Sequence, residues 1–197
     1  LDNNHIVKIH DTALEGWNNR EDIGNNKVMI GQTDKEIENL IREFNPDIVG
    51  VSILFSNLND SAHVIAGIVK KVNPKIYVLL GGNHISNSIV DYKANIIHPG
   101  DDIPLISDME DENVDFALLG EADFSIIELI NKLINNEDYS KVPGLLRRAS
   151  RGKYIDNPPG RSTDLINLPL PARHLVNMES YFDIGAFHSA KSRSNRV

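Results

Sequence analysis

The chain contains no cysteine. This excludes disulfides, thiolate metal sites and iron–sulfur clusters within these residues. The chain also lacks an apolar run of roughly 20 residues, the length needed to span a bilayer, and a secretory signal peptide at its first residues. There are no internal repeats and no Gly-x-Gly-x-x-Gly fingerprint after a first strand, which argues against a dinucleotide-binding fold. Because the sequence shows neither a membrane-spanning run nor a signal peptide, we expect a soluble, cytoplasmic protein.

Positive charge is also scarce. The chain of 197 residues has a formal net charge of −8, and its acidic residues are spread along the sequence. This balance argues against a nucleic-acid partner and against an anionic membrane surface. A hydrophobic content of 41% is enough for a real core. Because the chain begins with Leu1 and ends with "KSRSNRV", we expect it to be a fragment of a longer protein.

The hydrophobic pattern predicts alternating strands and helices. A capping box of Thr33 and Glu36 marks the start of one helix, and Pro46 marks its end. The run "DIVGVSILF" at 47–55 is apolar almost throughout, as expected of a central parallel strand covered on both faces. A long connection is expected at 12–32 and a looser segment at 86–113. The full set of expected elements is strands at 5–11, 47–55, 75–82 and 114–120, and helices at 33–44, 60–72 and 124–134.

This order predicts an α/β fold with a doubly wound, mainly parallel sheet of the Rossmann-like or flavodoxin-like kind. We assign residues 1–141 to this domain. Residues 142–197 are rich in proline and have few periodic stretches, so we expect an extended arm. Within the arm, "LLRRASRGKYI" is expected to form a short hairpin and "MESYF" a helical turn.

Three strand ends carry unusual residues. Ser52 lies at the end of one strand, Gly81 and Gly82 at the end of the next, and Gly120 at the end of the third. Ligands of open parallel sheets bind outside the carboxyl ends of the strands, so these loops are expected to share one edge and form a site. Glycines there would let a bulky group lie against the backbone. The alternative for each loop is that the glycines only turn the chain and that Ser52 bonds its own backbone.

The spacing of these residues resembles a known motif. Ser52 and Leu54 form a Ser-x-Leu, and 26 residues separate Leu54 from Gly81. This is similar to the second and third parts of the cobalamin-binding motif of B12-dependent methyltransferases and mutases. The resemblance implies that Ser52 hydrogen-bonds the tail base of the corrinoid and that Leu54 lines the channel beside this base. Gly81 and Gly82 would leave room for the tail in the channel.

The first part of that motif, Asp-x-His-x-x-Gly, supplies the cobalt-ligating histidine in the family. "DTALEG" at 11–16 has Ala13 where the histidine belongs and follows the wrong strand, so we assign no cobalt ligand. His63 and His84 are substitutes only in principle, and each is better read as a loop or helix-surface histidine.

A narrower resemblance covers nearly the whole chain. "FNPDIVGVSILFS", "VLLGGNH", "VDFALLGEADFS" and "DLINLPLPARHLVNMESYF" look like the N-terminal half of B12-binding radical S-adenosylmethionine (SAM) proteins, the group that includes relatives of the anaerobic magnesium-protoporphyrin ester cyclase and various methylases. The family's Gly-Glu-Gly-Glu appears here as "GEAD" at 120–123, and the opening strand is missing. The cofactor-binding set implied is Ser52, Leu54, Phe55, Ser56, Gly81, Gly82, Asn83, His84, Gly120 and Glu121.

The resemblance implies cobalamin as the cofactor of this domain. It places a [4Fe–4S] cluster and S-adenosylmethionine in a radical SAM barrel that this chain lacks. The parent enzyme would support methyl transfer or radical cyclisation, and the fragment alone would not be catalytic. Glu121 would accept hydrogen bonds from the corrinoid or cap the helix that follows it. Two alternatives stay open: a flavodoxin-like nucleotide-binding or interaction module with no corrinoid, and a strand-exchanged oligomer formed at the exposed sheet edge.

Overall fold

The structure, a computed structural model, describes residues 5–24, 28–160, 168 and 170–184. The chain divides into two compact units. One unit is formed by Leu40–Leu168, and the other by Leu1–Asn39 together with Pro169–Val197. The predicted site residues all belong to the first of these units.

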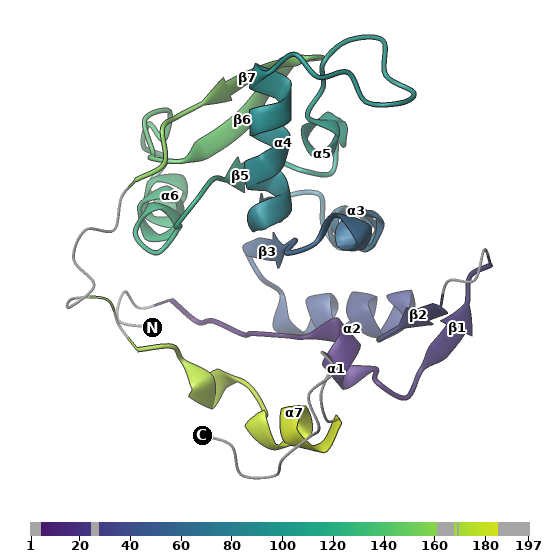
Figure 1. Cartoon of the computed structure of the whole chain (residues 1–197). Coiled ribbons are helices and arrows are strands. Elements are labelled where there is room, and N and C mark those ends of the chain that lie inside the picture. Colours follow the sequence, from purple (N-terminus) through teal and green to yellow (C-terminus); the bar gives the residue numbers. More distant parts are fainter. Residues whose placement is uncertain (1–4, 25–27, 161–167, 169, 185–197) are drawn as a thin grey trace. The chain divides into compact units, whose positions relative to one another are not determined.

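The Leu40–Leu168 unit is built on a five-stranded sheet with the order β3-β4-β5-β6-β7 (Figure 1). Strands β3, β4 and β5 pair in parallel, whereas β6 and β7 continue the sheet as an antiparallel hairpin. The expected α/β fold with a mainly parallel sheet is therefore confirmed, with an antiparallel extension at one side. The strands span Ile48–Ser52, Tyr77–Gly81, Phe116–Leu118, Leu145–Ser150 and Lys153–Asp156.

Helices connect the parallel strands, as parallel pairing of consecutive strands requires. A short 3-10 turn, η1 (Ser56–Leu58), leads from β3 into α3 (Asn59–Val72). After β4 the chain turns at once into α4 (Asn83–Lys93), and a second, shorter helix, α5 (Ser107–Glu110), precedes β5. Helix α6 (Ser125–Ile134) then leads to the hairpin.

The core lies between the sheet and its helices. Side chains alternate between the two faces of a strand, and on one face Leu79, Phe116, Leu118 and Leu145 pack with Leu129 of α6. The residues between them in the pairing register, Val78, Leu80, Ala117 and Leu146, are fully buried on the opposite face. Two covered faces explain why β4 and β5 read as continuous apolar runs.

Three sequence expectations are wrong. Residues 5–11 form no strand, and Ile6 in that segment is 87% exposed. Strand β3 is not central, because among the described residues it pairs with β4 alone. The segment 86–113 is not loose throughout, because α4 occupies Asn83–Lys93. Serine, asparagine and histidine dilute the apolar pattern of α4, and its helical state depends on burying Ile85 and Ile89.

The capped helix is confirmed. Helix α2 spans Asp34–Phe44. The Glu36 carboxylate accepts hydrogen bonds from the Thr33 backbone N–H at 2.7 Å and from its hydroxyl at 2.8 Å, and these bonds hold the pKa of Glu36 below its usual range. Asn45 adopts a left-handed conformation, with φ of 49°, at the end of the helix before Pro46.

The second unit joins the two ends of the chain. It holds α1 (Thr12–Glu15), the antiparallel pair β1 (Arg20–Asp22) and β2 (Val28–Ile30), the 3-10 turn η2 (Arg173–Leu175) and α7 (Met178–Ile184). The Asp11 carboxylate caps α1 and accepts a hydrogen bond from the Tyr181 hydroxyl at 2.9 Å. The helical turn expected at "MESYF" is confirmed as part of α7, while most of "DLINLP" lies outside the described residues.

The hairpin expected within "LLRRASRGKYI" is also confirmed, as β6 and β7. Its strands belong to the main sheet, so the sheet continues past residue 141. In the part of the chain that the structure describes, no helix combines the length and apolar content needed to cross a membrane.

Candidate functional site

The ends of β3 and β4 are held together by backbone hydrogen bonds. The parallel register places Ser52 opposite Gly81. Beyond this pair, the Ile53 N–H donates to the Gly81 carbonyl at 2.8 Å, and the His84 N–H donates to the Ile53 carbonyl at 3.1 Å. The loop after β3 therefore lies directly against the first turn of α4.

The third loop is joined to the same edge. The Gly120 N–H donates to the Ser86 hydroxyl at 3.2 Å, and that hydroxyl in turn donates to the Gly82 carbonyl at 3.3 Å. Because β3, β4 and β5 are parallel, the predicted residues after the three strands meet at one edge of the sheet, as parallel pairing requires.

The two glycines at the end of β4 are glycine for different structural reasons. Gly82 has a φ of +99°, and a Cβ built on it would lie 2.5 Å from the Ile53 carbonyl oxygen. Both facts require glycine for the fold itself, whether or not a ligand binds. The nearest atom to a Cβ on Gly81 would be the Leu118 carbonyl oxygen at 3.9 Å, which is ordinary contact. Gly81 is therefore the glycine whose missing side chain leaves space at the strand end.

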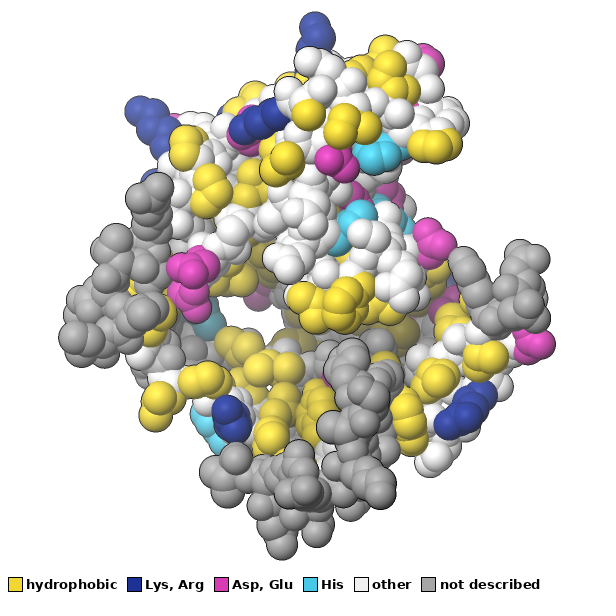
Figure 2. All heavy atoms as spheres, in the orientation of Figure 1, with side chains coloured by type: hydrophobic (Ala, Val, Ile, Leu, Met, Phe, Trp, Pro, Cys, Tyr) yellow, Lys and Arg dark blue, Asp and Glu magenta, His cyan; other side chains and the backbone are white. Residues whose placement is uncertain are grey.

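Apolar side chains are exposed around this edge. Leu54 is 55% exposed and Phe55 is 51% exposed, both in the loop after β3. Leu58 in η1 and Phe124 in the loop before α6 are similarly exposed. In the space-filling view, exposed hydrophobic side chains lie close to histidine side chains (Figure 2). A large, partly apolar ligand would cover such side chains, which water otherwise contacts.

The loop after β5 is acidic. Gly120 is left-handed, with φ of +70°, and a Cβ there would lie 3.1 Å from the Pro159 side chain. Glu121 lines a small pocket with Asp123 and Glu128. It does not cap α6, because the cap position is Phe124 and no side chain bonds the cap. Of the two roles expected for Glu121, helix capping is therefore not observed.

His84 is oriented from both sides of its ring. Its Nδ1 lies 2.9 Å from the Ser56 hydroxyl, and its Nε2 lies 3.3 Å from a carboxylate oxygen of Asp108. Only 17% of the His84 side chain is exposed. Asn83, its neighbour at the start of α4, is exposed and available to a ligand. His84 is thus a partly buried histidine in the first turn of α4, and it belongs to a polar network centred on a buried carboxylate.

Asp108 of α5 is the centre of that network. It is 1% exposed, and its other oxygen accepts a hydrogen bond from the Ser88 hydroxyl at 3.3 Å. His63 of α3 contacts Asp108 through Nε2 at 3.3 Å and Asp111 through Nδ1 at 2.6 Å. These four groups come from three helices and one loop.

The network carries charge. The hydrogen bond to Asp108 outweighs the effect of burial and, with the second carboxylate of Asp111, raises the pKa of His63 to about 8. Burial opposes the ionisation of Asp108, but the hydrogen bond and positive charge of His63, together with the nearby ring of His84, outweigh it and hold the pKa of Asp108 below its usual range. Asp108 is therefore a buried carboxylate held by histidines.

Sequence reasoning missed Asp108, Asp111 and Ser88. The acidic stretch that contains Asp108 lies 45 residues from His63, and nothing in its local pattern points to a histidine partner. Only the packing of α5 beside α3 and α4 brings these groups together. Among the described residues, no group of three or more histidine, aspartate and glutamate side chains is arranged to hold a metal ion.

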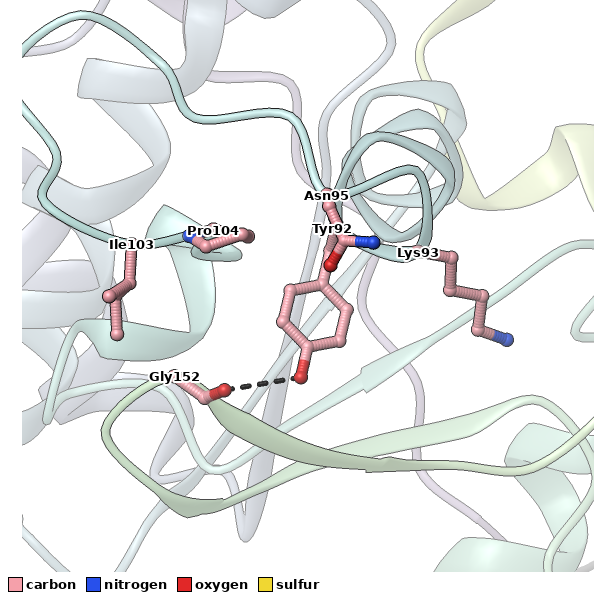
Figure 3. A pocket seen from close by; sticks show the side chains of 6 residues that line it. All are labelled: Tyr92, Lys93, Asn95, Ile103, Pro104 and Gly152. Atoms are coloured by element: carbon pink, nitrogen blue, oxygen red, sulfur yellow. Dashed lines mark hydrogen bonds between the residues drawn. The ribbon is translucent and has the colours of Figure 1, made fainter.

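A larger pocket of about 370 Å³ lies at the other end of α4 (Figure 3). It is lined by Tyr92, Lys93 and Asn95 of the α4 end and by Ile103, Pro104 and Gly152. The Tyr92 hydroxyl donates to the Gly152 carbonyl at 3.1 Å, and Lys93 is paired with Asp156. The pocket contains none of the predicted site residues, and two of its polar side chains, Tyr92 and Lys93, already have partners within the protein.

Residues 16–104 match the B12 binding domain family. This range includes the loops after β3 and β4 and ends before the loop after β5. A cytidylyl-2-hydroxyethylphosphonate methyltransferase from Streptomyces wedmorensis is 27% identical over 97% of this chain and 37% of its own length. An uncharacterized methyltransferase from Pyrococcus horikoshii is 26% identical over 76% of this chain and 29% of its own length.

One solved structure in the comparison is the radical S-adenosylmethionine methyltransferase TsrM from Kitasatospora setae. It is 16% identical, with a TM-score of 0.47, over 64% of this chain and 22% of that chain. The chain thus spans well under half the length of the curated relatives it matches.

Proposed function

Because this chain contains a B12-binding domain at residues 16–104, we propose that it is the corrinoid-binding part of a B12-dependent radical SAM methyltransferase. The observation that carries the proposal is the joined edge of β3 and β4, where Ser52 lies opposite Gly81 beside exposed Leu54 and Phe55. Similarity over most of the chain to two methyltransferases favours methyl transfer over cyclisation.

The residues at this edge fit a corrinoid. Gly81 leaves space at the strand end, and exposed Leu54 and Phe55 offer apolar cover for the tail base. A buried side-chain oxygen, Oδ1 of Asn59 in the first turn of α3, has no hydrogen-bond partner among the described residues. An unpartnered buried acceptor beside the loop suits a ligand with amide N–H donors.

The contribution of these residues is binding and orientation. When bound, the corrinoid supplies the methyl-transfer chemistry through its cobalt. Ser52 would hydrogen-bond the tail base, and Leu54 and Phe55 would exclude water from it. Asn83 and Ser56 would hold polar groups at the rim of the corrin ring. Gly120 and Glu121 would contact the cofactor at the neighbouring loop, with Glu121 as a hydrogen-bond acceptor.

Gly82 would contribute through the fold, since its conformation sets the start of α4 and hence the position of His84.

The cluster and S-adenosylmethionine would bind in a radical SAM barrel outside this chain, and that barrel would select the substrate. Under this proposal the exposed edge around Leu54 faces both the corrinoid and the substrate side of the barrel.

The test is a titration of the purified chain with hydroxocobalamin, followed by visible absorbance after desalting. We expect retention near one equivalent. Gly81→Leu should weaken retention at least tenfold, because the Cβ fits but the longer side chain fills the space left for the tail. Gly67→Leu is the matched control, since a Cβ on Gly67 of α3 meets nothing within 4 Å.

Retention that is equal in wild type and Gly81→Leu would place the corrinoid elsewhere. No retention by a folded wild-type chain would contradict the proposal and favour the interaction or nucleotide-binding module.

A further inference from the structure

The buried network around Asp108 is not explained by the proposed binding residues alone. A buried carboxylate is costly unless it is paired, yet this one is 1% exposed and lies directly behind two groups at the site edge, His84 and Ser56. Through His84, the Asp108 carboxylate can determine which hydrogen-bonding atoms Ser56 presents to a ligand.

His63 keeps the Asp108 carboxylate ionised. Both ring nitrogens of His63 face carboxylates, at 2.6 Å for Asp111 and 3.3 Å for Asp108. A neutral imidazole has only one N–H, so donation to both carboxylates requires the imidazolium. The positive ring balances one of the two negative charges that it contacts. Asp108 is then an acceptor on both oxygens, with Ser88 donating to the second one.

An ionised Asp108 determines where His84 carries its proton. The Asp108 oxygen lies 3.3 Å from His84 Nε2, and a carboxylate attracts an N–H and repels a lone pair. The proton of a neutral His84 therefore belongs on Nε2. His84 Nδ1 is then a lone pair, 2.9 Å from the Ser56 oxygen, and accepts the Ser56 hydroxyl proton.

We propose that Asp108 is a positioning residue for the corrinoid site, which acts through the His84 tautomer to present the Ser56 oxygen as a hydrogen-bond acceptor. With its hydroxyl proton directed to His84, Ser56 has only lone pairs to offer a ligand. The matching ligand group is an amide N–H, which the peripheral carboxamides of a corrinoid supply. This inference rests on the proposed function for its ligand, but not for the proton position on His84.

The test combines two readouts. The first is the 15N NMR signal of the His84 ring nitrogens in the chain without ligand, near neutral pH, assigned with His84→Gln and His63→Gln. The second is the hydroxocobalamin affinity of Ser56→Ala, Asp108→Asn and the double variant. Ser88→Ala is the matched control, because it removes a hydrogen bond to Asp108 while its contact with His84 is to the backbone carbonyl, at 3.1 Å, and not to the ring.

We expect the wild type and Ser88→Ala to carry the His84 proton on Nε2, and Asp108→Asn to shift part of it to Nδ1. Ser56→Ala and Asp108→Asn should each weaken hydroxocobalamin binding roughly threefold to tenfold, the range expected for one hydrogen bond. Because Asp108 acts through Ser56, the double variant should bind no more weakly than Ser56→Ala alone.

A His84 proton on Nδ1 in the wild type overturns the inference, and so do additive losses in the double variant. Loss of stability in Asp108→Asn with unchanged affinity and an unchanged proton position would show a purely structural role. If Asp108→Asn does not fold, two measurements still test the inference. These are the position of the His84 proton in the wild type and the affinity of Ser56→Ala, whose altered side chain is exposed. A wild type that binds no hydroxocobalamin but has the Nε2 proton contradicts the proposed function and leaves the tautomer assignment standing.

Discussion

At the scale of single residues, two adjacent glycines with the same sequence appearance have different roles. The motif treats Gly81 and Gly82 as one unit that admits a ligand. The backbone separates them, since Gly82 is left-handed against the Ile53 carbonyl while Gly81 has space around it. A glycine pair in a binding motif can thus hold one residue for the fold and one for the ligand.

This difference predicts different stabilities. Gly82→Ala should lower the free energy of unfolding by roughly 2–4 kcal/mol, because it combines a left-handed conformation with a Cβ placed 2.5 Å from backbone oxygen. Gly81→Ala should cost less than about 1 kcal/mol, since its Cβ makes an ordinary contact. Urea unfolding of both variants measures the difference. Equal losses would contradict the separation of roles.

The raised pKa of His63 predicts that the stability of the folded chain depends on pH. Its pKa is raised from 6.5 to about 8 in the folded chain. A raised pKa means that the imidazolium stabilises the fold fully below pH 6.5, and that this contribution is lost as pH rises through 8. The loss should be about 2 kcal/mol.

The measurement is the free energy of unfolding in urea across this range, in the wild type and in His63→Gln. The variant should be less stable at the acidic end and should lack the decline of the wild type toward alkaline pH. Parallel pH profiles for the two proteins would show that His63 does not carry the effect.

At the scale of elements, strong local signals succeeded and weak ones failed. The capping box at Thr33 and the apolar stripe of α3 placed two helices correctly, because caps and periodic faces act within a few residues. Helix α4 was missed because its sequence is polar and its buried residues, Ile85 and Ile89, acquire partners only in the packed fold.

The packing of the β6–β7 hairpin leads to a prediction about which C-terminal truncations the Leu40–Leu168 unit tolerates. Val142, Leu145 and Leu146 are at most 1% exposed, and β6 pairs with β5 in the main sheet. A chain ending at Lys141 should therefore lose cooperative thermal unfolding, whereas one ending at Gly160 should keep it. Circular dichroism melting curves compare the two. A cooperative transition in the shorter chain would support a domain that ends at residue 141.

At the scale of the whole molecule, the sequence predicts self-association through an open sheet edge. Within the described residues, β3 pairs on one side only, and "IVGVS" has no charge or proline to protect an edge. We expect an oligomer that grows with protein concentration. Salt should favour it by screening the net charge of −8.

Sedimentation or light scattering across a concentration series measures the oligomer. Gly50→Lys in β3 is the informative variant, because a Cβ there meets nothing within 4 Å and the added charge disfavours edge pairing. A monomer at every concentration, with or without salt, would count against strand exchange.

The sequence by itself determined the fold class, the strands Ile48–Ser52, Tyr77–Gly81 and Phe116–Leu118 and the three loops at their carboxyl ends, since hydrophobic periodicity acts locally. Tertiary structure decided which glycine leaves space, that β3 lies at the edge of the described sheet, and that Asp108 lies behind His84. These features depend on contacts between segments such as α3 and α5, whose paired side chains are 45 residues apart. No local pattern encodes a pairing of that kind, because it arises only when helices pack on a common sheet.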